Sequence, residues 1–222
     1  MSAASTLPLA VVISGRGSNM AAIAHACASG QIGARIVCVI ADRHSAGGIA
    51  LARQLGLEVT VVAAQEFTDR AAFEDALGAA IDRSGAQLVV LAGFLRILSP
   101  QFARRYAGAM LNIHPALLPK FPGLHTHERA LRAQETVHGA SVHFVTSELD
   151  AGPVVLQARV PVLAGDTAAS LSARVQRQEH ILYPRAIGWI AAGRVRLVGD
   201  TVFFDGQALE QPLIEAIGAP LS

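Results

Sequence analysis

The chain has 222 residues, of which 52% are hydrophobic and only 16% are charged. This composition is typical of a compact globular protein with a full hydrophobic core, and it excludes a disordered chain. Eighteen lysines and arginines are balanced by 17 aspartates and glutamates, so no excess of positive charge predicts binding to nucleic acid or to an anionic membrane.

The N-terminal segment and the cysteines indicate a cytoplasmic protein. The opening MSAASTLPLAVVISG contains an apolar run that is too short to span a bilayer and has no basic segment before it. We therefore predict neither a signal peptide nor an anchor, and we expect residues 1–8 to form a loose lead into the first strand. Cys27 and Cys38 lie in apolar surroundings without a CxxC spacing and are interpreted as buried free thiols.

In the first half of the chain, short apolar runs alternate with helical patterns. The predicted strands cover residues 9–13, 35–41, 59–62 and 87–91. The predicted helices cover residues 18–29, 47–55 and 69–84. Strands that are apolar on both faces and alternate with helices favour a doubly wound α/β fold with a mostly parallel sheet covered on both sides.

The second half of the chain adds strands that do not fit a purely parallel sheet. A short helix over 100–106 is followed by predicted strands over 109–113, 141–145 and 154–160. The last two are separated only by TSELDAGP, which is too short for a helical crossover. We therefore predict an antiparallel strand on this side of the sheet.

The C-terminal part combines a long helix with a hairpin. A helical pattern covers residues 167–192, and Pro184 is expected to kink or break it. The segment VRLVGDTVFFDGQ predicts a closing hairpin around Gly199 and Asp200. Because the sequence contains no internal repeat or linker, we predict a single domain over residues 1–222.

The turn after the first strand has the composition of a phosphate-binding loop. Gly15 and Gly17 lie between a buried strand and a helix, where backbone N–H groups and the helix dipole favour an anion. An ordinary glycine turn explains them equally well at this point. The G-x-G-x-x-G dinucleotide fingerprint has Met20 in place of its third glycine, but Asp42 could act as the ribose-binding acid, so NAD remains an alternative.

A second polar group follows the strand predicted over 109–113. Asn112 and His114 are alternate residues of an extended segment, so their side chains should share a face at the carboxyl edge of the sheet. An amide donor and an imidazole facing together could stabilise an oxyanion and move a proton. A purely structural histidine is the alternative. The following loop is restricted by Pro115, Pro119 and Pro122.

Asp150 lies in the turn ELDAGP and could orient His114 if the fold brings the two together, although such a turn also uses aspartate for its own geometry. No G-x-S-x-G elbow or nearby cysteine predicts covalent catalysis. His125 and His127 lack a third ligand at a suitable spacing, so we expect no metal site.

Five motifs occur together in order: SGRGSN, LAGFLRIL, LNIHPALLPKFPGLHTH, SVHFVTSELDAGPV and RVQRQEHILYP. From about Leu9 to Gln207 the chain thereby resembles the phosphoribosylglycinamide formyltransferases. The resemblance implies a Rossmann-like formyltransferase fold. It also implies direct transfer of a formyl group from 10-formyltetrahydrofolate to the amine of N1-(5-phospho-D-ribosyl)glycinamide, in de novo purine biosynthesis, through a tetrahedral intermediate.

The resemblance also implies roles for individual residues. The catalytic set falls on Asn112, His114 and Asp150. The nucleotide and its phosphate would be bound by Gly15, Arg16, Gly17, Ser18, Asn19 and Glu179. The folate would be bound by Arg70, Phe94, Leu95, Arg96, Ile97, Leu98 and Asn112. His143 would lie behind the catalytic residues and contact them rather than the substrates.

Two positions depart from the family pattern. Arg16 stands where some members have asparagine and adds a positive charge beside the phosphate. Ala151 replaces a glycine often found beside the aspartate.

Methionyl-tRNA formyltransferase and formyltetrahydrofolate deformylase share the Asn-x-His-Pro core, but each carries a further domain. A catalytically silent phosphosugar-binding module is an alternative of another class. We expect small-molecule substrates as the only partners, and a monomer or weak homodimer.

Overall fold

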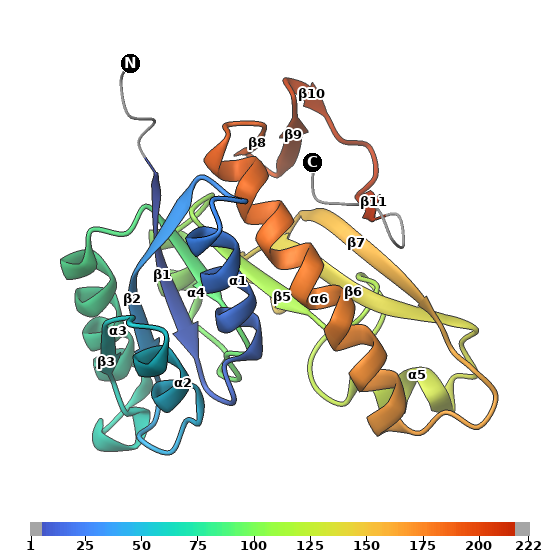
Figure 1. The fold of residues 1–222 in the computed structure, drawn as a ribbon, viewed down its shortest axis with the longest axis horizontal. Helices are drawn as coiled ribbons and strands as arrows, with labels where there is room; N and C mark the ends of the chain where they lie inside the picture. The colour runs from blue at the N-terminus through green and yellow to red at the C-terminus, as the bar shows by residue number, and fades with distance from the viewer. Residues whose placement is uncertain (1–5, 216–222) are drawn as a thin grey trace.

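The computed structural model describes residues 6–215, which form a large sheet, a small sheet and the surrounding helices (Figure 1). The helices are α1 (Ser18–Ala28), α2 (Gly48–Gln54), η1 (Ala64–Glu66), α3 (Arg70–Ser84), α4 (Pro100–Arg105), α5 (Thr126–Arg132) and α6 (Ala168–Ala191). The large sheet contains β1 (Leu7–Ile13), β2 (Ala34–Ala41), β3 (Val59–Val61), β4 (Leu88–Leu91), β5 (Met110–His114), β6 (Val137–Phe144), β7 (Val154–Pro161) and β11 (Leu213–Glu215). The small sheet contains β8 (Val195–Val198), β9 (Thr201–Phe204) and β10 (Gln207–Ala208).

The large sheet is doubly wound and mostly parallel, which confirms the predicted fold class. Its strand order is β11-β7-β6-β5-β4-β1-β2-β3, and β6 is antiparallel to both of its neighbours. The chain moves outward from β1 to β3 and then returns to place β4 on the other side of β1. This reversal creates a crevice beyond the carboxyl ends of β1 and β4, where ligands bind in folds of this kind.

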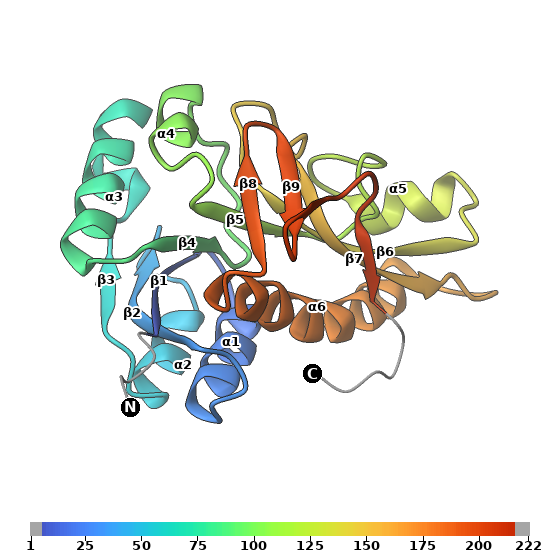
Figure 2. The same ribbon diagram turned by 90° about the horizontal axis from the view of Figure 1, so that it is seen from above.

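Helices cover both faces of the sheet because its central strands are apolar on both sides. Leu9, Val11 and Ile13 belong to the apolar cluster shared with α1, α2 and α6. The alternate residues Ala10 and Val12 belong to the cluster shared with α3 and α4. Figure 2 shows these two groups of helices on opposite sides of β1 and β4. No helix within residues 6–215 is long and apolar enough to cross a membrane.

Helix α6 runs without interruption through Pro184, so the predicted break at this residue is wrong (Figure 1). The reason is tertiary packing. Pro184 is buried, and the hydroxyl of the fully buried Tyr183 lies 3.1 Å from the carbonyl oxygen of Leu91 and 3.0 Å from that of Leu111. Through Tyr183, the residue before the proline, these contacts fix the helix to β4 and β5. They compensate for the helical hydrogen bond that Pro184 cannot make because it has no backbone N–H.

The two ends of the chain differ in part from expectation. Strand β1 begins at Leu7, which pairs with Ala34, so the predicted loose lead is wrong for residues 7–8, while residues 1–5 lie outside the described part. The hairpin of β8 and β9 is confirmed. Unpredicted β10 extends it, and unpredicted β11 pairs in parallel with β7.

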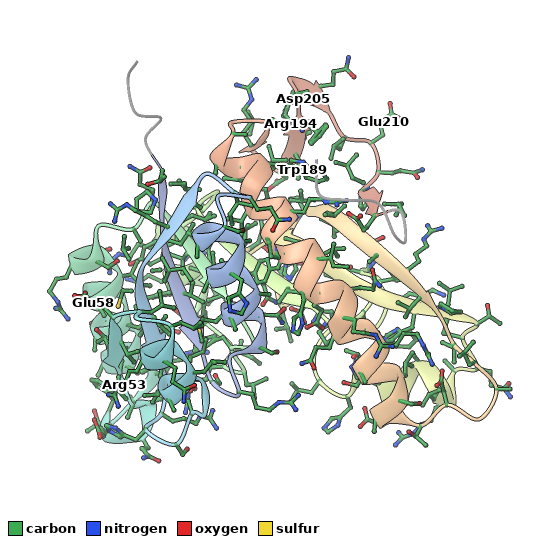
Figure 3. The ribbon with its side chains drawn as sticks, in the orientation of Figure 1. Arg53, Glu58, Trp189, Arg194, Asp205 and Glu210 are labelled. Atoms are coloured by element: carbon green, nitrogen blue, oxygen red, sulfur yellow. The ribbon has the colours of Figure 1, made fainter. Side chains whose placement is uncertain are left out.

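The small sheet packs against the end of α6 through an aromatic contact, and an ion pair joins the residue before β8 to the residue after β9 just beyond the helix (Figure 3). The rings of Trp189 and Phe204 are 5.0 Å apart between centroids in an edge-to-face arrangement. Arg194 donates two hydrogen bonds to the carboxylate of Asp205, at 3.0 and 2.8 Å. This sheet lies outside the crevice, so the following sections concern the large sheet.

Candidate active site

A cavity of about 520 Å³ opens beyond the carboxyl ends of β4 and β5. It contains most of the residues that the sequence nominated, although they come from segments far apart in the chain. Those lining it are Asn19, Phe94, Leu95, Arg96, Ile97, Leu98, Asn112, His114, His143, Asp150 and Glu179. The fold therefore brings the predicted catalytic set, the predicted folate segment and one part of the predicted nucleotide site to a single cavity.

The side chain of Asn112 is oriented by His143. The two residues face each other across β5 and β6, with Asn112 Nδ2 3.2 Å from His143 Nε2. His143 Nδ1 lies 3.0 Å from the carbonyl oxygen of Phe144, which can only accept, so Nδ1 carries the hydrogen and Nε2 accepts from the amide. Burial lowers the pKa of His143 to about 4, against the opposing effects of the Phe144 carbonyl and Asp150, so this ring is neutral near pH 7.

His114 lies between a backbone carbonyl and a carboxylate. Its Nε2 is 2.9 Å from the carbonyl oxygen of Phe121, so Nε2 donates, and its Nδ1 is 3.4 Å from Asp150 Oδ2. The side chains of His114 and Asp150 are 6% and 8% exposed. Asp150 Oδ2 also accepts the backbone N–H of Gly123 at 2.8 Å, and Oδ1 is 3.7 Å from His143 Nε2. The carboxylate of Asp150 thus lies between the rings of His114 and His143.

The loop after β5 is fixed by hydrogen bonds from side chains of β6 and β7. Ser141 donates to the carbonyl of Ala116 at 2.7 Å and accepts from the backbone N–H of Leu118 at 3.0 Å. Gln157 donates to the carbonyl of Leu118 at 2.8 Å. Phe121 is left-handed, with φ 57°, an unfavourable conformation for a bulky residue. This strained residue is the one whose carbonyl meets His114.

The predicted phosphate loop is packed against the start of α2. Gly17 has φ 77°, and a Cβ at this position would lie 2.9 Å from the Cα of Gly48. The backbone N–H of Gly48 donates to the carbonyl of Gly15 at 2.9 Å. Only glycine fits this close approach of two backbones. Arg16 is exposed beside the turn and lies outside the cavity lining, as do Gly15, Gly17 and Ser18.

Helix α6 connects the phosphate loop to the cavity. Asn19 Nδ2 donates to Glu179 Oε2 at 2.8 Å, and Gln176 Nε2 donates to Ser18 Oγ at 3.1 Å. Burial raises the pKa of Glu179 despite the bond from Asn19. Within the described residues, Asn19 Oδ1 is buried without a hydrogen-bond partner, so it is free to accept from a ligand. We did not predict Gln176 from the sequence as part of this site. Its position one helical turn before Glu179 indicates that the two side chains lie on the same face of the helix.

Of the predicted folate-binding residues, one does not line the cavity. Arg70, the first residue of α3, has a side chain that is 58% exposed, and its Nε is 3.8 Å from Glu74 Oε1. It is absent from the cavity lining. Glu74 also accepts the backbone N–H of Ser99, so Arg70 lies outside the cavity but near the end of the segment that contains residues 94–98.

The surroundings of Asp42 do not support the alternative of a dinucleotide-binding site. Arg43 and Arg96 both donate to its carboxylate, and its side chain is 1% exposed, so it cannot serve as an accessible ribose-binding acid. Among residues 6–215, no three His, Cys, Asp or Glu side chains are grouped so that they could bind a metal.

Residues 7–187 match the family described as formyl transferase. Phosphoribosylglycinamide formyltransferase of Escherichia coli (strain K12) is 49% identical over 201 residues, covering 90% of this chain and 95% of the relative. The corresponding Haemophilus influenzae enzyme is 43% identical over the same shares of the two chains.

Solved structures agree with the relatives. The phosphoribosylglycinamide formyltransferase of Coxiella burnetii superposes with a TM-score of 0.90 at 45% identity, covering 94% of this chain and 99% of that one. Glycinamide ribonucleotide transformylase 1 of Symbiobacterium toebii superposes with a TM-score of 0.88 at 40% identity, over 91% and 95%. The doubly wound fold of this chain is shared with these group-transferring enzymes. The chain belongs to the formyl transferase family, which confirms the resemblance found in its motifs.

Proposed function

We propose that this enzyme transfers the formyl group of 10-formyltetrahydrofolate to the amine of N1-(5-phospho-D-ribosyl)glycinamide. The products are the N2-formyl ribonucleotide and tetrahydrofolate, within de novo purine (IMP) biosynthesis. The observation that carries the proposal is the grouping of Asn112, His114 and Asp150 in one cavity. The names of relatives at 49% and 43% identity support the choice of substrates.

The chemistry requires an oxyanion to be stabilised and a proton to be moved. The amine attacks the formyl carbon, and the carbonyl electron pair moves to oxygen. Asn112 Nδ2 gives one hydrogen to His143 and has a second for this oxyanion. The Nε2–H of His114 is the second donor, and it would exchange the Phe121 carbonyl for the formyl oxygen.

Collapse of the intermediate breaks the bond between carbon and N10 of the folate. N10 must receive a proton while the attacking nitrogen loses one. Asp150, beside His114 and 8% exposed, is the group we assign to this relay, with water carrying the proton between the two nitrogens. The backbone N–H of Gly123, which donates to Asp150 Oδ2 at 2.8 Å, would keep the carboxylate aligned while the proton moves.

The two substrates would enter from opposite sides of the catalytic residues. The phosphate would bind at the turn of Gly15, Arg16, Gly17, Ser18 and Asn19, at the N-terminus of α1. Glu179 and the free Oδ1 of Asn19 would accept from the ribose hydroxyls. The folate ring would occupy the slot made by residues 94–98, with Arg70 at its outer approach.

We assign the protein to the cytoplasm, as a monomer or weak homodimer that has only small-molecule partners. Formyl transfer of this kind uses the folate as co-substrate and needs no metal.

The test is an assay of purified protein with a 10-formylfolate analogue and the ribonucleotide, followed by folate absorbance. Formation of deformylated folate only when the ribonucleotide is present supports the proposal. Deformylation without an acceptor would instead indicate a hydrolase such as formyltetrahydrofolate deformylase. Transfer of the formyl group to methionyl-tRNA would indicate a methionyl-tRNA formyltransferase. Binding of both ligands without turnover would leave a silent binding module and overturn the proposal.

A further inference from the structure

The wall of the cavity formed by residues 93–99 packs against the core through Phe94 and Leu98, whereas its middle residues are exposed. Leu95 and Ile97 are each 60% exposed, so neither side chain anchors this segment in the core. The backbone N–H of Leu95 donates to Ser14 Oγ at 3.0 Å, and the carbonyl of Gly93 accepts from the backbone N–H of Ser14 at 3.2 Å. The middle of this wall, residues 95–97, therefore depends on polar contacts with the ends of neighbouring strands.

Asp42 supplies the main polar contact from β2. It follows the last residue of that strand, and its side chain is 1% exposed. Arg96 Nε donates to Asp42 Oδ2 at 2.8 Å, and Arg43 donates to both carboxylate oxygens at 2.9 and 3.1 Å. The guanidinium carbon of Arg96 lies 5.5 Å from the ring centroid of Phe73. Arg96 is thus held at one edge by the carboxylate and on one face by the ring.

The carboxylate is charged at neutral pH. Burial would raise the pKa of Asp42, but hydrogen bonds from Arg43 and Arg96 outweigh it and hold the pKa below its ordinary value. A neutral amide at this position keeps one accepting oxygen but loses the other and the negative charge, so it would hold the two guanidinium groups less strongly. Asp42 is absent from the cavity lining, so its effect on ligand binding must pass through neighbours that reach the wall. Arg96 lines the cavity itself, and Ser14, which also hydrogen-bonds to Asp42, holds only the backbone of Leu95.

The far end of the same wall is fixed independently. Glu74 of α3 accepts the backbone N–H of Ser99 at 2.6 Å and also the hydroxyl of Ser99. The hydroxyl of Ser99 in turn accepts from the backbone N–H of Phe102 and caps α4. Loss of the Asp42 contact should therefore loosen the middle of the wall and leave its two ends and the fold in place.

We propose that Asp42 is a positioning residue that holds Arg96, and with it the wall of residues 94–98, in the geometry that binds the folate co-substrate. This inference rests on the proposed function, because it assigns that wall to the folate.

The test compares Asp42→Asn with Arg43→Ala in steady-state kinetics. Asp42→Asn should raise the KM for the formylfolate about tenfold, the effect of losing one charge-assisted hydrogen bond, and leave kcat and the ribonucleotide KM within about twofold. Arg43→Ala removes the other partner of Asp42 but keeps the contact with Arg96, and Arg43 does not line the cavity. It should therefore leave the folate KM unchanged.

A double-mutant cycle with Arg96→Gln tests the route of the effect. If Asp42 acts through Arg96, Asp42→Asn should add no further increase in folate KM in the Arg96→Gln background. Should Asp42→Asn fail to fold, Arg96→Lys gives the same test, because lysine keeps the charge but cannot donate from Nε while stacking on Phe73. Its folate KM should rise to the level expected for Asp42→Asn.

An unchanged folate KM in Asp42→Asn or Arg96→Lys would overturn the inference. So would an equal increase in both substrate KM values, or an additive effect in the cycle. These outcomes require active wild-type enzyme, so they are distinct from failure of the proposed function, in which the wild type transfers no formyl group. In that case, fluorescence titration with tetrahydrofolate compares the variants directly, and equal affinities overturn the inference.

Discussion

Asn112 and His143 are joined across antiparallel strands by a hydrogen bond in which the amide donates and the imidazole accepts, at 3.2 Å. The bond determines which way the amide of Asn112 faces, because the opposite orientation would set its oxygen against the lone pair of Nε2. His143 is 2% exposed and does not need to touch a substrate to have this effect.

His143→Ala should therefore lower kcat by about 10- to 100-fold with little change in either KM, because the oxyanion donor loses its orientation in the transition state. Because burial lowers the pKa of His143 to about 4, the loss should be the same at pH 6.5 and pH 8.5. His25→Ala, at an exposed histidine of α1, is the control. A loss that varies between these two pH values would show that His143 titrates during catalysis.

His114→Ala and Asp150→Asn should each lower kcat by about 10²- to 10⁴-fold, the usual contribution of a group that transfers a proton. Asp150 has a left-handed backbone, with φ 52°, which asparagine tolerates well, so this substitution removes charge and keeps the turn. Circular dichroism and thermal unfolding should match the wild type. Near-wild-type turnover in either variant would remove that residue from the mechanism.

Much of this arrangement could be predicted from local sequence. The buried strands are continuous apolar runs, and Asn112 and His114 are visible as polar residues at the end of one. The pairing of His114 with Asp150 depends on a loop that returns to β5, which spacing along the chain does not determine. Likewise, the continuity of α6 through Pro184 depends on contacts of Tyr183 with residues more than 70 positions away.

Other differences have the same physical origin. The helix α5 follows a left-handed His125, with φ 58°, and has no side-chain cap, so it lacks the usual start signal. Strand β11 has only three residues and exists because the edge of β7 is available for pairing. Family motifs gave Arg70 a ligand-binding role by position, whereas its side chain is exposed outside the cavity in the described structure.

Arg16→Asn should raise the KM for the ribonucleotide several-fold, with kcat nearly unchanged, because an exposed charge beside the phosphate turn improves binding without entering the chemistry. The difference from wild type should shrink as salt increases from about 0.05 to 0.5 M. Arg53→Asn, at the exposed end of α2 (Figure 3), removes the same charge at a distance from the turn. Equal effects of the two substitutions would mean that Arg16 makes no local contact with the phosphate.

Gly17→Ala should abolish ribonucleotide binding or unfold the protein, because a Cβ at φ 77° would lie 2.9 Å from the Cα of Gly48. Gly30→Ala is the matched control: its φ is 73°, but nothing lies within 4 Å of the added carbon. The control should cost only the left-handed backbone penalty, about 1–2 kcal/mol in urea unfolding. Equal losses of stability would show that the two backbones can separate at Gly48.

The last prediction concerns stability at acid pH and rests on His138, which is 1% exposed. Its Nε2 lies 3.2 Å from Nδ1 of His127, and its ring packs edge-to-face against Phe121, the residue that contacts His114. Burial lowers the pKa of His138 to about 4 from 6.5, and His127 adds to this effect. The carbonyl of Pro115 and the carboxylate of Glu135 favour the charged ring, but burial outweighs them.

The sign follows from linkage. Between pH 6.5 and pH 4 the unfolded chain binds a proton at His138 that the folded chain does not. The free energy of unfolding therefore decreases as the pH is lowered from 6.5 toward 4. The expected loss from this residue is on the order of 3 kcal/mol, and it is complete only below the folded pKa. Above pH 6.5 the contribution is fully present and constant.

Urea unfolding of the wild type and of His138→Gln at pH 4.5, 5.5, 6.5 and 7.5 isolates this contribution, because other titrating groups affect both proteins alike. Glutamine retains a polar group near His127 but does not titrate, so the variant should lose less stability than the wild type as pH falls from 6.5. Their difference should be constant above pH 6.5. Parallel curves over the whole range would show that His138 takes up its proton without disturbing the loop that carries Phe121.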